Sequence, residues 1–188
     1  MPFARVIGAV LLFSVMLAGA AAAQTPEHGN LEFAMLGGLT VLMPHEDGDN
    51  TTMFTVPQGS AGVLLGAFPS FRMTYWTRSA LLADLGFSLV TASEDGDSFT
   101  AFNIEGGIGA VLGPRTSRTT GFVTGLFGLL STSNGDSRSE GYLGGQAGIR
   151  TMINDYSAFR FQAGYRSMLG DEFDFSTLEI AAGLSFFL

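Results

Sequence analysis

Apolar and polar residues alternate with a period of two in eight strand-length segments of this sequence. Successive side chains of a β-strand point to opposite faces of a sheet, so each segment would present one apolar and one polar face. Helical periodicity is absent after residue 23, and we therefore predict an all-β protein. The predicted strands span 30–42, 66–76, 80–92, 98–111, 119–132, 139–151, 156–168 and 176–188.

The connections between these segments alternate in kind. Three are short: TRS at 77–79, LGPRTSR at 112–118 and MIND at 152–155. The other four are more acidic, and the first of them spans 43–65. Tight turns would thus gather at one end and acidic loops at the other. On an even number of antiparallel strands, this asymmetry is typical of an up-and-down transmembrane β-barrel of the outer-membrane type.

The mid-strand charges all fall on the face opposite the continuous apolar face, in seven of the eight segments. A charge that faced lipid would cost a few kcal/mol near the membrane midplane, so we predict that these residues form an ion-pair network inside the lumen. The apolar face of the segment 119–132 cannot be assigned, because Phe122 and Phe127 lie on opposite sides of it. The predicted network consists of Glu32, Arg72, Asp84, Glu105, Arg150, Arg160, Arg166 and Glu179.

The composition favours the membrane interpretation. Only 14% of residues are charged and 46% are hydrophobic, whereas soluble domains average about 25% charged residues. A net charge of −8 without any lysine argues against binding to a phosphate backbone, so we expect no nucleic-acid partner. The alternative is a secreted, lipocalin-like barrel that binds a small apolar ligand, which would require the apolar faces to point inward.

Residues 1–23 read as a cleaved signal peptide, with Arg5 followed by an apolar run and small residues before Gln24. An uncleaved membrane anchor is the alternative. We predict export and a single barrel domain at 24–188, without disulfides because the sequence has no cysteine. Interfacial aromatic residues are expected at the short-turn end, at Tyr75, Trp76 and Tyr156.

The last strand ends in GLSFFL, and this segment resembles the C-terminal pattern of the small OmpA/OmpX-like outer-membrane barrels of Gram-negative bacteria. Gly183, Phe186 and Leu188 occupy the positions of that pattern, although a terminal Phe is commoner than Leu188. The resemblance implies an eight-stranded barrel whose C-terminus is recognised by the barrel-assembly machinery. Phe187 falls on the inward side, and we expect it at the periplasmic rim as a plug or an interfacial aromatic.

We expect a structural or surface-interaction role through the acidic loops, chiefly 43–65, with a filled lumen and no open pore. The expected partners are outer-membrane lipid and lipopolysaccharide, and the expected state is a monomer without cofactor or metal. The acidic clusters EDGDN at 46–50 and EDGD at 94–97 lack the twelfth-position Glu of an EF-hand loop, so we interpret them as solvated turns on an exposed rim. Weak binding of divalent cations that bridge to lipopolysaccharide phosphates is the alternative. The alternative, which the resemblance implies, is an enzyme that modifies lipid A: the palmitoyltransferase of that group is similar in having a histidine in its first external loop, where His45 lies. His45 would then be the base and Ser98 the hydroxyl partner.

Overall fold

The computed structural model describes residues 31–44, 50–55, 71–77, 80–94, 97–113, 117–134, 136–170 and 173–188. The predicted signal peptide at 1–23, His45 and most of the 46–50 cluster lie outside the described residues. The nine strands are β1 (Leu31–Pro44), β2 (Thr51–Thr55), β3 (Phe71–Trp76), β4 (Leu81–Glu94), β5 (Asp97–Leu112), β6 (Thr119–Asn134), β7 (Asp136–Asn154), β8 (Ser157–Met168) and β9 (Phe175–Phe187).

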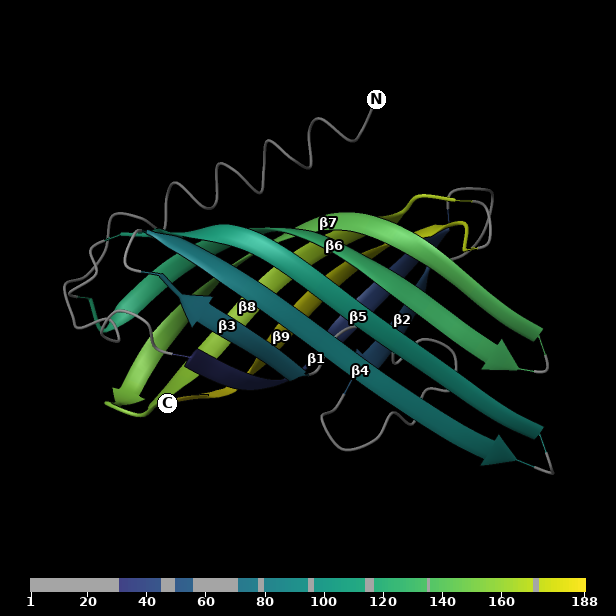
Figure 1. The fold of residues 1–188 in the computed structure, drawn as a ribbon, viewed down its shortest axis with the longest axis horizontal. Coiled ribbons are helices and arrows are strands. Elements are labelled where there is room, and N and C mark those ends of the chain that lie inside the picture. The colour runs from purple at the N-terminus through teal and green to yellow at the C-terminus, as the bar shows by residue number, and fades with distance from the viewer. Residues whose placement is uncertain are drawn as a thin grey trace.

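These strands form one antiparallel sheet that closes into a barrel (Figure 1). From β3 to β9 each strand pairs with the next along the chain, and β1 pairs with both β3 and β9. All of these strands except β2 form the closed ring, so the barrel has eight strands. Closure matters here because it gives hydrogen-bond partners to the edges that an open sheet would leave free.

Strand β2 lies within the segment 43–65 that was predicted to be one external loop, so that prediction is wrong for Thr51–Thr55. Those residues pair antiparallel with Gly38–Leu42 in the outer half of β1. The lower half of the same edge of β1 pairs with β3, from Leu31 to Met35. The short strands β2 and β3 together provide the hydrogen-bond partners for one edge of the long strand β1. Backbone groups left unpaired at such an edge would be costly in hydrocarbon.

One end of the barrel, here called the short-turn end, carries the connections β3–β4, β5–β6 and β7–β8. At the β7–β8 turn, the amide of Tyr156 donates to Oδ1 of Asn154 over 2.9 Å, and the ladder shifts register between Met152 and Asn154. Arg118 braces this turn by donating to the carbonyl oxygens of Met152 and Ile153 over 2.8 and 3.1 Å. The opposite end, called the loop end, carries the hairpins β4–β5 and β6–β7, which extend farthest in Figure 1.

Candidate functional site: a filled lumen and an apolar outer wall

The outer wall of the barrel is apolar. Large hydrophobic side chains alternate outward along the strands and are exposed, for example Ile108 at 69%, Leu89 at 64% and Phe127 at 61%. The residues between them point inward and are buried. This burial is the reverse of what a water-soluble barrel requires, so the alternative of a soluble binder with an apolar interior does not fit the structure.

All eight charged residues of the predicted network lie inside the barrel and are almost fully buried. Seven ion pairs connect them into one chain of alternating sign. The order along this chain is Glu179, Arg166, Glu105, Arg72, Asp84, Arg160, Glu32 and Arg150. Four carboxylates and four guanidinium groups balance, so the lumen carries no net charge from these residues and the burial of each ion is compensated by a neighbour.

The centre of this ion-pair chain is the pair of Arg72 and Glu105. Arg72 donates from Nε and Nη2 to Oδ2 of Asp84 over 3.0 and 2.8 Å, and from Nη2 to Oε1 of Glu105 over 2.7 Å. Arg166 contacts Glu105 on its other side and donates from Nη1 to Oε2 of Glu179 over 2.6 Å. Five strands are tied together across the lumen in this way, namely β3, β4, β5, β8 and β9.

Neutral polar side chains fill the space around the charges. Gln146 donates to Oδ2 of Asp84 over 2.7 Å and accepts from Gln162 over 3.2 Å. The hydroxyl of Tyr142 lies 2.8 Å from Oδ1 of Asn103 and 3.0 Å from Oε2 of Glu105. Interlocking side chains therefore occupy the middle of the lumen.

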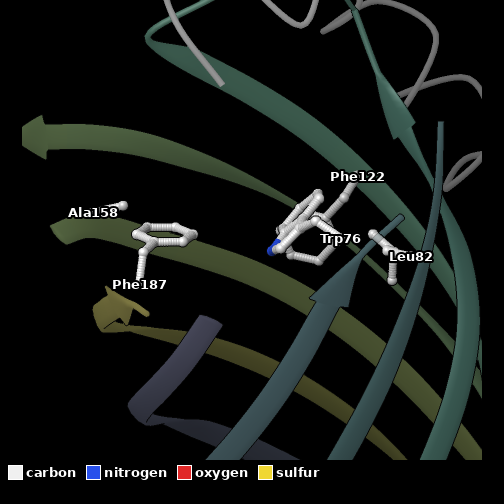
Figure 2. Packing of buried hydrophobic residues seen from close by; sticks show 5 residues of the cluster. All are labelled: Trp76, Leu82, Phe122, Ala158 and Phe187. Carbon is white, nitrogen blue, oxygen red and sulfur yellow. The ribbon is translucent and has the colours of Figure 1, made fainter. Parts of the chain in front are cut away.

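An apolar cluster lies at the short-turn end of the lumen, and Figure 2 shows its buried members. Its buried members are Trp76, Leu82, Phe122, Ala158 and Phe187. Phe187 thus faces the interior as a plug, in agreement with the expectation for that residue. Trp76 was expected to be an interfacial aromatic, and this prediction is wrong: its ring is buried at 7% exposure, and its Nε1 donates to Glu32 over 2.8 Å.

A second apolar cluster lies at the loop end of the lumen. Leu130, Tyr142 and Met168 form its buried part, and Phe173 and Phe175 pack against them. Glu140 holds the β8–β9 connection over this cluster, because its carboxylate accepts the backbone amides of Gly170 and Phe173. Sequence reasoning missed Glu140, although it is a charged residue on the inward face of its strand, and that position was the available signal.

The C-terminal residues that carry the family resemblance lie at the seam between β9 and β1. Phe186 and Leu188 point outward and are 50% and 82% exposed. Gly183 faces inward, where an added Cβ would lie 1.8 Å from the carbonyl oxygen of Met35 on β1. Only glycine permits this close approach of the two backbones.

Neither a metal centre nor a catalytic group is apparent in the described ranges. They contain no group of three or more His, Cys, Asp or Glu side chains placed to hold a metal ion. Within the same ranges, no helix is long and apolar enough to cross a membrane. The enzyme candidates are not juxtaposed by the structure: His45 is outside the described residues, and of Ser98 only the backbone, in β5, is described.

Comparison with known proteins found matches by structure alone. No family model matches the sequence, and no curated protein sequence matches it. Neisserial surface protein A superposes with a TM-score of 0.60 at 11% identity, over 84% of this chain and 96% of that protein. The outer membrane protein OprG from Pseudomonas aeruginosa superposes with a TM-score of 0.52 at 12% identity, over 88% and 99%.

The chain has the fold of a small outer-membrane β-barrel. The structural match covers nearly the whole of both barrels, in accord with the eight-stranded architecture expected from the sequence. A shared fold does not carry a shared task, so the role of this barrel has to be argued from its own residues.

Proposed function

We propose that this protein is an integral outer-membrane barrel with a structural or surface-interaction role, and that it does not form a pore. The observation that carries the proposal is the reversed burial of the strands. A wall of exposed residues such as Phe87, Ile104 and Phe161 would be unfavourable in water and is suited to lipid.

The proposal that the barrel does not conduct rests on what fills its lumen. The ion-pair chain and its amide partners occupy the middle, and an apolar cluster lies at each end. A permeating ion would have to displace paired charges that are buried from solvent, at a cost of several kcal/mol for each pair broken.

The role of the barrel is therefore proposed to lie at its surfaces. The loop end carries the acidic connections, and the described tip of the β6–β7 hairpin exposes Ser137, Arg138 and Ser139. We propose lipopolysaccharide and outer-membrane lipid as its surroundings, the barrel-assembly machinery as its partner during biogenesis, a monomeric state, and no enzymatic activity.

Cell fractionation combined with gel migration tests this proposal. The protein should be recovered in the outer-membrane fraction and migrate faster without heating than after boiling, as closed membrane barrels do. Recovery in the soluble periplasmic fraction would refute it. In planar bilayers, the purified barrel should show no stable ion conductance, and well-defined open channels at neutral pH would refute the proposal of a closed lumen.

A further inference from the structure

The seam between β1 and β9 is the pairing that joins the two ends of the barrel-forming chain. Strands β3 to β9 pair with their neighbours in sequence, whereas the seam brings Glu32 opposite Phe187. Just below this pair, the backbone amide of Leu188 donates to Leu31 over 3.0 Å, and that of Leu31 donates back over 3.4 Å. Closing the longest loop costs the most chain entropy, so the seam is expected to form late in folding.

Two inward side chains of the seam, those of Glu32 and Phe187, contact residues of strands other than β1 and β9. Oε2 of Glu32 accepts Nε1 of Trp76 over 2.8 Å and Nη1 of Arg150 over 3.3 Å. The Arg150 guanidinium lies 4.0 Å from the ring centroid of Trp76 and 5.1 Å from that of Phe187. Trp76 comes from β3 and Arg150 from β7, so these contacts reach across β1, β9 and β8 and enclose the seam.

Arg150 differs from the other three arginines of the ion-pair chain. Arg72, Arg160 and Arg166 each lie between two carboxylates, whereas Arg150 ends the ion-pair chain and, among the described residues, pairs only with Glu32. Its Nε and Nη2 are buried and have no hydrogen-bond partner among the described residues. The faces of two aromatic rings occupy the place of a second carboxylate, and a desolvated guanidinium is stabilised by such contacts.

We propose that Glu32, Trp76, Arg150 and Phe187 form a seam clasp that fixes the C-terminal strand to the first strand at the short-turn end. Phe187 docks only when β9 has paired with β1, and its docking completes the environment of the Arg150 cation. The clasp thus couples closure of the barrel wall to burial of a charge in the lumen. This inference concerns how the barrel stays closed and does not depend on what the loops contact.

The test compares Phe187→Ala with Phe186→Ala in protein folded in detergent micelles. The two residues are neighbours of the same type on β9, but Phe187 points into the clasp and Phe186 points outward at 50% exposure. Trp76 is the only tryptophan in the chain, so its quenching by acrylamide reports on the clasp directly. Hydrogen exchange of the amides of Leu31 and Leu188 reports on the seam.

Phe187→Ala should raise the quenching constant of Trp76 about threefold and lower the protection of the two seam amides about tenfold, with amides of the β6–β7 ladder unchanged, because opening is local. Phe186→Ala should change neither reading more than about twofold. Equal effects of the two substitutions, or a uniform loss of protection in all strands, would overturn the proposal.

Glu32→Gln keeps the test decisive if Phe187→Ala does not fold, because it preserves the size of the side chain. Its matched control is Glu179→Gln, which neutralises the carboxylate at the other end of the ion-pair chain. Glu32→Gln should lower protection at Leu31 and Leu188 about tenfold, and Glu179→Gln should leave both within about twofold. Protection at these amides that stays at the wild-type level in Glu32→Gln would overturn the proposal.

Discussion

Replacing Glu105 with glutamine removes the carboxylate shared by two arginines in the lumen. Glu105 accepts from Nη2 of Arg72 over 2.7 Å, from Nε and Nη2 of Arg166, and from the hydroxyl of Tyr142 over 3.0 Å. The side chain of glutamine has nearly the same shape, so the substitution creates no cavity. What changes is the charge: the network goes from four acids and four arginines to three and four.

The expected loss of unfolding free energy follows from the ion-pair partners that Arg72 and Arg166 keep. Arg72 keeps Asp84 and Arg166 keeps Glu179, so neither cation is wholly unpaired. Removing one member of a buried ion pair costs about 3–5 kcal/mol when the other is left unpaired. Because each arginine here retains one carboxylate, we expect the lower end of that range, about 3 kcal/mol of lost unfolding free energy.

Urea unfolding in lipid vesicles, followed by the fraction of fast-migrating folded protein on gels, measures this loss. Two double variants distinguish pairing from net charge, since both restore the charge balance. Glu105→Gln with Arg166→Gln removes two residues in contact and should show a coupling energy of about 1–3 kcal/mol. Glu105→Gln with Arg150→Gln removes two residues that form no ion pair with each other and should be additive within about 0.5 kcal/mol.

A loss of less than about 1 kcal/mol for Glu105→Gln would refute this reasoning, because that is the range of solvated surface pairs. Equal coupling in the two double variants would also refute it. In that case, overall charge balance and not the contact between specific side chains would determine the stability of the lumen.

Three further substitutions, one of them with a matched control, test other parts of the structure. Ile104→Arg on the outer wall should lower the unfolding free energy in vesicles by about 2–4 kcal/mol, whereas Ser139→Arg at the exposed hairpin tip should change it by less than about 0.5 kcal/mol. Gly183→Ala should lower the melting temperature of the barrel, because its Cβ would meet the backbone of Met35 at 1.8 Å; an unchanged temperature would contradict the close approach at the seam. Glu140→Ala should leave two backbone amides of the β8–β9 connection without an acceptor and raise protease cleavage there, while resistance equal to wild type would contradict its anchoring role.

The barrel itself could be predicted from the sequence because the strand period of two fixes which residues share a face. Once Arg160 and Phe161 are placed on opposite sides, the cost of a charge in lipid decides which side points inward. The structure places Arg160 at 2% exposure and Phe161 at 40%. The ion-pair partners could not be predicted, because the contact of Arg72 with Glu105 depends on the register of strands that are far apart in sequence.

The segment 119–132 resisted prediction for a physical reason that the structure supplies. One face of strand β6 contributes Phe122 to the apolar cluster in the lumen, and the other face contributes the exposed Phe127 to the outer wall. Both faces of such a strand are apolar, and alternation carries no information there. Trp76 was misplaced for a different reason: it shares the inward face of its strand with Arg72 and Thr74, but an aromatic residue at a strand end suits both an interface and a plug.

Strand β2 was missed because its residues carry no clear strand pattern of their own. Thr51–Thr55 follows an acidic turn-like cluster and has no local pattern that separates it from a loop. It becomes a strand by folding back on the preceding strand β1, with Phe54 opposite Leu39. Pairing of this kind is decided by the open edge of the neighbouring strand and not by intrinsic preference.

A nitroxide label at Ile108→Cys tests most directly whether the apolar face of the strands contacts lipid. The chain has no cysteine of its own, so the label would be unique, and Ile108 is 69% exposed on the outer wall. For the barrel in lipid vesicles, the label should collide more often with oxygen, which concentrates in hydrocarbon, than with a water-soluble nickel complex. A label that the nickel complex reaches more readily than oxygen would place this face in water and contradict the account.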